Sequence, residues 1–425
     1  MSQRQPRIAI IGGGPAGLTL GALLHQRGIP FTIYELRPRP TEEELAEPSG
    51  MLDLHEESGI AAIRACGLYE KFLPLTGDCE ESMIIADKHG NILHSDDGGE
   101  AVRPEIARHN IVKLFLSKLP VDSIKYDSKV LSADRDATTG EVTLKISSTP
   151  DAATFVSETY DLAIGADGAW SRIRPILSDV KPQSSGLQYL TLLIRDIDTR
   201  HPQLASMVGK GSFLALGNKH GLDSHRAPQG SAQIYLMTNA LGGDEEEMIE
   251  SLSKLTTPQL KEHFLSDEKS YGDFAPALKE LITAAFDEEE ARNGSGGSVQ
   301  LKPLSMLPVG HRWEPKPGAT LIGDAAHLMT PFAGEGVNMA MLDALDLAAA
   351  IGEAWALVQA GKGGDGAEFR EVLGPLLGRF EEGMFVRAQE KAEESWKNRG
   401  LMFAEDGAQA LAGLMKSFYE AVPPQ

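Results

Sequence analysis

Unbroken apolar runs mark three short strands that lie far apart in the chain. The runs at 8–11, 162–166 and 319–322 carry almost no polar side chain, as strands do in the middle of a covered parallel sheet. Apolar residues recur at helical spacing over about 337–359 and 369–398, which predicts two long helices. This combination of buried strands and helices is typical of an α/β fold.

The region from about 185 to 240 has a different pattern. Long apolar runs at 187–194, 213–217 and 232–238 predict strands of a separate, largely antiparallel sheet. The polar stretch 218–230 between two of these runs is predicted to be a loop.

Three glycines follow the first strand with the spacing G-x-G-x-x-G: Gly12, Gly14 and Gly17. In this motif the first glycine permits a tight turn, the second lets a pyrophosphate approach the backbone, and the third lets a helix pack closely on the strand. Glu35 closes the next strand 21 positions after Gly14 (35 − 14), near the spacing of an acid that binds a ribose hydroxyl. The motif predicts a bound dinucleotide, with an unliganded βαβ unit as the alternative. It does not choose between NAD and FAD.

The third buried strand ends at Gly323 and Asp324, where a carboxylate could accept a hydrogen bond from a polyol hydroxyl. A loop rich in proline and glycine then opens the helix that begins near Val337. Backbone N–H groups at a helix start form a partly positive pocket, which suits the edge of a flavin ring that gains negative charge on reduction. A glycine-rich helix cap is the alternative, and His327 in this stretch is interpreted as structural.

A third turn, Asp167 and Gly168, ends the second buried strand and is followed by Arg172 and Arg174. It could contact the cofactor or shape the groove beside it. The alternative is a capping aspartate with solvated arginines.

Composition narrows the class of protein further. The 425 residues include 61 acids and 40 bases, and the resulting net charge of −21 argues against nucleic acid and anionic membranes as partners. The two cysteines, Cys66 and Cys79, form no disulfide framework or zinc-binding motif, so no metal is expected and a reducing compartment is favoured. There is no room for a signal peptide before the first strand and no apolar run of roughly 18 residues, so the protein is predicted to be cytoplasmic.

Taken in order, the three turns make the chain resemble the class A (single-component) flavoprotein monooxygenases of the aromatic-hydroxylase type. The resemblance covers almost the whole chain. Within this family the sequence is most similar to the tetracycline-inactivating TetX group, the tetracycline destructases, at 50–55, 105–108, 323–338 and 393–395.

The resemblance implies a Rossmann-like FAD-binding domain formed by 1–182 and 300–365. It implies a substrate-binding domain of largely antiparallel sheet plus helices at 183–299, and a long C-terminal bridging helix at 366–425. The implied cofactor is FAD, with NADPH as a transient co-substrate and molecular oxygen as the oxidant. A C4a-hydroperoxyflavin would deliver the oxygen atom, so no catalytic side chain is expected. A monomer is expected.

Site residues also follow from the resemblance. Those expected to contact FAD are Gly12, Gly14, Ala16, Gly17, Glu35, Arg37, Asp53, Arg108, Asp167, Asp324, Pro331, Gly334, Gly336, Val337 and Asn338. From the residues alone, Arg108 could equally be solvated and Asp53 could be a turn residue. Many members have an arginine in the loop after the second strand, but none occurs between Thr41 and Ile63, so Arg37 or Arg39 would have to replace it.

Substrate contacts are assigned to Ile194, Ser212 and Gln233, where the tetracycline group would have Gln, Arg and His, and to Phe332 and Ala333 in the glycine-rich loop. Because these polar groups do not match, tetracycline, a polyketide and another enol or phenol all stay open as substrates.

The predicted function is therefore FAD- and NAD(P)H-dependent hydroxylation of an electron-rich enolic or phenolic small molecule. Inactivation of tetracycline antibiotics is one form of it, and polyketide or aromatic metabolism is another. The alternatives are a flavin halogenase or reductase, a flavin protein that gates partner binding by redox state, and an NAD dehydrogenase. All four tryptophans are isolated, which argues against a halogenase with paired tryptophans.

Overall fold

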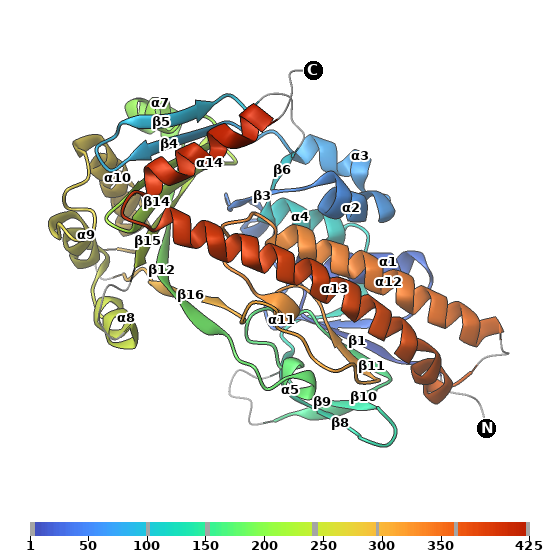
Figure 1. Ribbon diagram of the computed structural model, residues 1–425. Coiled ribbons are helices and arrows are strands. Elements are labelled where there is room, and N and C mark those ends of the chain that lie inside the picture. The colour runs from blue at the N-terminus through green and yellow to red at the C-terminus, as the bar shows by residue number, and fades with distance from the viewer. Residues whose placement is uncertain are drawn as a thin grey trace.

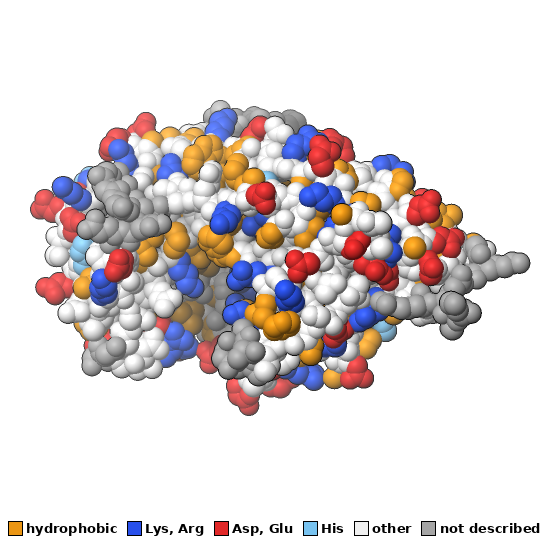
Figure 2. Space-filling model, turned by 90° about the horizontal axis from the view of Figure 1, so that it is seen from below, with side chains coloured by type: hydrophobic (Ala, Val, Ile, Leu, Met, Phe, Trp, Pro, Cys, Tyr) orange, Lys and Arg blue, Asp and Glu red, His pale blue; other side chains and the backbone are white. Residues whose placement is uncertain are grey.

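The computed structural model describes residues 5–98, 103–148, 154–239, 245–294, 297–360 and 364–421. Figure 1 shows a long helix, α13 (Gly366–Met402), that crosses the molecule beside α12 (Gly336–Ala360). The described residues contain no helix with the length and apolar character needed to span a bilayer. Seen from below, the surface is hollowed between two lobes, and basic and hydrophobic side chains border the hollow (Figure 2).

The first region is built on a parallel sheet. In the described residues it has five strands in the order β17 (Ala319–Leu321), β11 (Leu162–Gly165), β1 (Ile8–Ile11), β2 (Thr32–Tyr34) and β7 (Ile124–Lys125). Every residue of β1, β11 and β17 is buried, as their unbroken apolar runs predicted. One hydrophobic core joins these strands to α1 (Pro15–Gln26), α12 and the first half of α13. The predicted mixed α/β fold is therefore confirmed.

Smaller elements complete this region. An antiparallel sheet contains β8 (Lys129–Arg135), β9 (Val142–Ser147) and β10 (Val156–Tyr160), and a two-stranded ribbon pairs β3 (Met51–Asp53) with β6 (Glu105–Ala107). The short helices are α2 (Ala61–Ala65), α3 (Tyr69–Phe72), α4 (Arg108–Leu116), α5 (Arg174–Leu177) and α11 (Asp324–His327).

The second region is a larger, mostly antiparallel sheet. Its seven described strands follow the order β16 (Lys302–Met306), β12 (Gln183–Ile194), β15 (Ser231–Asn239), β14 (His220–Ala227), β13 (Ser212–Gly217), β4 (Met83–Asp87) and β5 (Ile92–Asp96). The elements beside it include α6 (Ile197–Arg200), α7 (Pro202–Val208), α8 (Glu245–Ser253), α9 (Thr257–Ser266) and α10 (Pro276–Asn293). Apolar side chains from α7, α9 and α10 form one core with the sheet, so one sheet face is covered by helices.

Sheet membership divides the chain differently from the predicted boundaries. Strands β4, β5 and β16 lie within 1–182 and 300–365, yet they are hydrogen-bonded in the seven-stranded sheet. The chain therefore passes between the two regions more often than the predicted division assumes.

Two other predictions need correction. The stretch 218–230, predicted to be a loop, contains β14, in which residues 221–225 are paired on both sides. The terminal helix does not continue to the end of the chain: after Met402 the chain turns, and α14 (Gly407–Ala421) packs on the other face of the seven-stranded sheet. Apolar residues of α14 supply this contact, for example Leu411 against a cluster that includes Leu214.

Candidate functional site

The carboxyl ends of β1, β11 and β17 lie side by side because these strands are neighbours in one parallel sheet. The three predicted turns follow these strands and touch one another. A Cβ atom at Gly12 would lie 3.0 Å from the Cα of Asp167, and one at Gly323 would lie 3.5 Å from the Cβ of Ala16. The structure therefore gathers the three turns at the edge of the sheet where α/β proteins bind ligands.

The glycines of the first turn have different environments. Gly12 has a φ of +109°, and a Cβ there would lie 2.2 Å from the carbonyl oxygen of Ala166. A Cβ at Gly17 would lie 2.0 Å from the Gly12 carbonyl oxygen, so the fold itself requires glycine at both positions. Around the Cβ position of Gly14, the described residues place no atom within 4 Å apart from the adjoining backbone. This open backbone, at the start of α1, is what a pyrophosphate needs.

Glu35 lies against the glycine turn. Its Oε2 accepts a hydrogen bond from the backbone N–H of Gly13 at 2.6 Å, and its Oε1 accepts one from the N–H of Arg37 at 2.9 Å. These bonds fix the carboxylate at the end of β2, beside the expected pyrophosphate. The Arg37 side chain is exposed, and its contact with the cofactor stays a prediction.

The second turn is tied to the third by a buried arginine. Arg174 donates from Nε to the carbonyl oxygen of Ala325 at 2.9 Å and from Nη2 to that of Ala169 at 2.8 Å. Its side chain is therefore structural and not solvated. Asp167 accepts from the N–H of Arg172 through Oδ2, while its buried Oδ1 has no hydrogen-bond partner among the described residues. Burial raises the pKa of Asp167.

Asp324 begins α11 and is exposed to water, although protein surrounds it closely enough to raise the pKa of its carboxyl group. The positive charges of His327, Arg108 and Arg174 oppose that rise. His327 points elsewhere: its Nε2 is 2.6 Å from Oδ2 of Asp343, which also accepts from the N–H of Gly323. Both side chains are buried, so His327 holds the turn in place.

The start of α12 is joined to β3 through Asn338. This side chain accepts from the backbone N–H of His55 at 2.9 Å and donates to the carbonyl oxygen of Asp53 at 3.0 Å. Asn338 is fully buried, so it positions the loop through these bonds. The carboxylate of Asp53 lies 3.4 Å from the Cβ position of Gly334. Apart from the adjoining backbone, no atom in the described part of the chain lies within 4 Å of the Cβ position of Gly336.

Neighbouring residues of this loop are partly accessible. Pro331 and Gly334 are exposed, and Val337 is half-buried. The loop thus presents backbone at the N-terminal end of a 25-residue helix.

A chain of charged groups locks the same loop to β3 and α13. The ring of His55 lies 3.1 Å from a carboxylate oxygen of Asp53 and 3.4 Å from one of Glu335, and Lys391 of α13 lies 2.6 Å from Glu335. Hydrogen bonds to Asp53 and Glu335 raise the pKa of His55 to about 9. Burial acts to raise the pKa of Glu335, but bonds from His55 and Lys391 lower it to about 2.

These features fit FAD. The backbone is open at Gly14 and Gly336, which lie at the starts of two helices, and Asp167 carries an oxygen without a partner between them. The side chain of Asp324 is exposed to water, and the preceding Gly323 lies close to Ala16. The three turns thus offer helix N-termini to the anionic parts of the cofactor and carboxylates to its hydroxyl groups.

The seven-stranded sheet turns a polar face toward β3 and β6. Asp223 and His225 alternate along β14, and their register partners in β15 are Tyr235 and Gln233. The Tyr235 hydroxyl lies 2.8 Å from the Cβ position of Gly50, immediately before β3. Burial raises the pKa of Tyr235, and Arg108 is among the charges that act on it. The Nε atom of Arg108 lies 3.9 Å from the same Cβ position of Gly50, so Arg108 and Tyr235 both border Gly50.

The strand residues predicted to contact the substrate lie on different faces of the seven-stranded sheet. Ser212 and Gln233 lie on the polar face, in register with His225, although the Gln233 amide donates to the carbonyl oxygen of Leu192. Ile194 lies on the opposite, helix-covered face and is fully buried in its core. It pairs with Ala232, the residue before Gln233, and successive residues of a strand point to opposite faces. That prediction is incompatible with the structure.

The two loop residues in the substrate prediction remain near the sheet. Phe332 packs edge-on against Phe403, with ring centroids 5.4 Å apart, and Ala333 beside it is half-buried. Asp223, His225 and Tyr235 were not among the predicted site residues. Tyr235 lies between Ile234 and Leu236, which is a strand pattern, but Asp223 and His225 stand in a largely polar stretch that gives little signal.

The flavin-binding fold, joined to a polar sheet, places this protein in the class of FAD-dependent monooxygenases of the aromatic-hydroxylase type. The family profile described as "FAD binding domain" matches residues 6–216 and 313–365, and the chain belongs to this family. Monooxygenase asqM of Emericella nidulans is 34% identical over 447 residues, which cover 98% of this chain and 100% of the relative.

Solved structures share the fold. Klebsiella pneumoniae HpxO, complexed with FAD and uric acid, has a TM-score of 0.71 at 18% identity, covering 98% of this chain and 93% of that one. Tetracycline destructase Tet(51) has a TM-score of 0.60 at 18% identity, with 100% of both chains covered. The specific resemblance to the tetracycline group is thus not confirmed, since that likeness shows the fold alone while a fungal monooxygenase is far more similar in sequence.

Proposed function

We propose that this protein uses NAD(P)H and molecular oxygen to hydroxylate a planar enolic or phenolic small molecule. FAD supplies the oxygen-transfer chemistry, and the chain supplies binding, orientation and exclusion of water. The observation that carries the proposal is the polar sheet face formed by Asp223, Tyr235 and Gln233, which faces the strand pair that also carries Asp53.

Each part of the chain has a distinct task in this reaction. Asp324, Glu35 and the open backbone at Gly14 hold the cofactor, and the start of α12 places helix N–H groups where negative charge develops. Hydroxyl and amide groups on β14 and β15 orient the oxygen substituents of the substrate. Arg108, whose charge acts on both Asp324 and Tyr235, favours an anionic enolate or phenolate.

Apolar groups border the same space. Phe332 and Phe403 form an aromatic pair at the end of α13, where α14 closes the sheet face. They suit an aromatic or polycyclic substrate and keep water from the reacting atoms. An anionic co-substrate such as NADPH suits the hollow bordered by basic side chains on the lower surface (Figure 2).

The test is substrate-dependent NAD(P)H oxidation by the yellow holoprotein, with mass spectrometry of the product made under ¹⁸O₂. The panel contains simple phenols, enolic polyketides, uric acid and a tetracycline. Uric acid is included because HpxO binds it in its complex, and a tetracycline because the similar structure Tet(51) is a tetracycline destructase. One labelled oxygen in one product supports the proposal and names the substrate class. NAD(P)H use without an oxygenated product from any compound contradicts it and favours a flavin reductase. No NAD(P)H use with any compound also contradicts it and favours a redox-gated binding protein.

Variants separate substrate binding from cofactor binding. Tyr235→Phe should raise KM at unchanged flavin content because it removes one hydroxyl from the polar face. Ile194→Val is the matched control, since it lies on the opposite face and removes only one buried methylene. Equal effects of the two substitutions would place the substrate elsewhere.

A further inference from the structure

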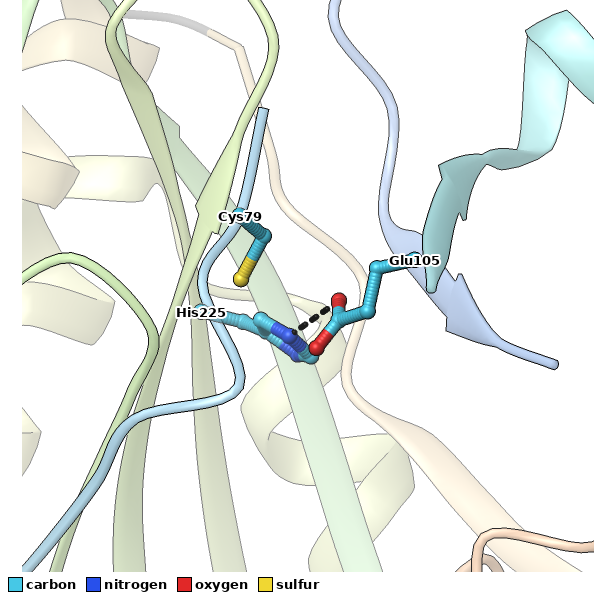
Figure 3. A group of neighbouring side chains, drawn as sticks. All are labelled: Cys79, Glu105 and His225. Atoms are coloured by element: carbon cyan, nitrogen blue, oxygen red, sulfur yellow. Dashed lines mark hydrogen bonds and ion pairs between the residues drawn. The ribbon is translucent and has the colours of Figure 1, made fainter. Parts of the chain in front are cut away.

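Three side chains of different chemistry converge at the polar sheet face (Figure 3). Cys79 comes from the segment before β4, Glu105 from β6 and His225 from β14. Their sulfur, oxygen and nitrogen atoms all lie within 4.8 Å of one another, and His225 Nε2 is 2.8 Å from Glu105 Oε2. Three elements from two regions of the molecule therefore meet at one point.

The set has the composition of a zinc site. Thiolate sulfur, imidazole nitrogen and carboxylate oxygen are the ligands that Zn²⁺ takes in proteins, and three of them with one open position are common. A thiolate and a carboxylate together carry two negative charges, which a divalent cation neutralises. The nitrogen and oxygen need to separate only to about 3.4 Å for bonds of about 2.1 Å in tetrahedral geometry, a small rotation of the Glu105 side chain.

Burial favours a cation here. The side chains of Cys79 and Glu105 are buried, while that of His225 is 23% exposed, so water reaches the cluster from the histidine side. Charged ligands in a dry setting attract a cation more strongly than they do at a surface. The exposed side leaves the fourth coordination position for a water molecule.

We propose that Cys79, Glu105 and His225 bind one divalent cation with the preferences of Zn²⁺. Glu105 is the register partner of Asp53 in the β3–β6 ribbon, and His225 belongs to the seven-stranded sheet. The ion therefore ties the ribbon that carries Asp53 to the substrate sheet. Sequence spacing does not reveal this site, because Glu105 and His225 are 120 residues apart.

The experiment measures metal bound to the FAD-loaded protein, independently of turnover. The holoprotein is stripped with a chelator, dialysed against ZnCl₂ and assayed for zinc by mass spectrometry, and its affinity is measured by competition with a chromophoric chelator. One equivalent per chain is expected. Cys79→Ser and His225→Gln should each weaken binding at least about tenfold, since each removes a ligand.

A second measurement identifies the sulfur ligand. Cd²⁺ added to the stripped holoprotein should produce an ultraviolet thiolate-to-metal absorption band that Cys79→Ser abolishes. Cys66→Ala, at the other buried cysteine, should leave it intact. Flavin content and circular dichroism verify that each variant is folded. A wild-type protein that takes up no zinc, or a band that survives Cys79→Ser, would overturn the site and reduce the cluster to a hydrogen-bonded group.

Discussion

Replacing His55 with glutamine tests the charged chain that holds the loop before α12. His55 is buried, and its ring lies between the carboxylates of Asp53 and Glu335, which is in turn bound by Lys391. A rise in its pKa from 6.5 to about 9 corresponds to about 3 kcal/mol of stabilisation. The lowered pKa of Glu335 describes the same contact from the other partner, so the two values are not added.

The sign of the pH dependence follows from the raised pKa. The folded protein retains the His55 proton between pH 6.5 and 9 while the unfolded chain releases it, so the stabilisation is complete below pH 6.5 and lost as the pH rises toward 9. For Glu335 the stabilisation is complete above pH 4.5 and lost as the pH falls toward 2.

The assay is thermal unfolding of the wild type and His55→Gln at several pH values, with FAD in fixed excess. Between pH 6.5 and 9 the wild type should lose about 3 kcal/mol relative to the variant, or about 3–4 °C in Tm for a chain of this length. His25→Gln, at an exposed position of α1, controls for the loss of an imidazole. If the wild type and His55→Gln show parallel Tm curves over this range, the assigned ion pairs do not stabilise the fold.

Three further changes have distinct expected outcomes. Gly14→Ala should leave the Tm of the FAD-free protein unchanged but weaken FAD binding at least about tenfold in a fluorescence titration, whereas Gly12→Ala should lower that Tm because its Cβ meets backbone. Arg174→Met should cost at least about 2 kcal/mol in denaturant unfolding, since it removes charged hydrogen bonds to carbonyl groups; no loss would show that the bonds are dispensable. Burial raises the pKa of Glu381 to about 7, so the wild type should lose about 3 kcal/mol relative to Glu381→Gln between pH 4.5 and 7, and a constant difference would exclude a buried carboxyl group that titrates there.

The cofactor half of the fold was predictable because its signals are local. The apolar run of β1 and the glycines that follow it act over a few residues, and the turn at Gly12 has a conformation that glycine adopts most easily. The three turns could be expected to meet because parallel strands place their carboxyl ends at one edge.

The region of the seven-stranded sheet was less predictable because some of its strands carry polar residues. Those residues face another part of the molecule, which only the folded structure shows. β14 was interpreted as a loop because the stretch 218–230 is largely polar, yet its Asp223 and His225 lie on the face that meets β6. Ile194 was assigned from an expected alignment, and a shift of one residue moves a side chain to the opposite face. The cytoplasmic location and monomeric state stay predictions.

A crystal structure of the yellow FAD-bound protein would show directly where the cofactor lies. One flavin is expected, with its pyrophosphate at Gly14, its ribityl chain at Asp324 and its ring at the loop from Gly334 to Gly336. Electron density for the flavin anywhere else, with those three turns facing solvent, would contradict this expectation.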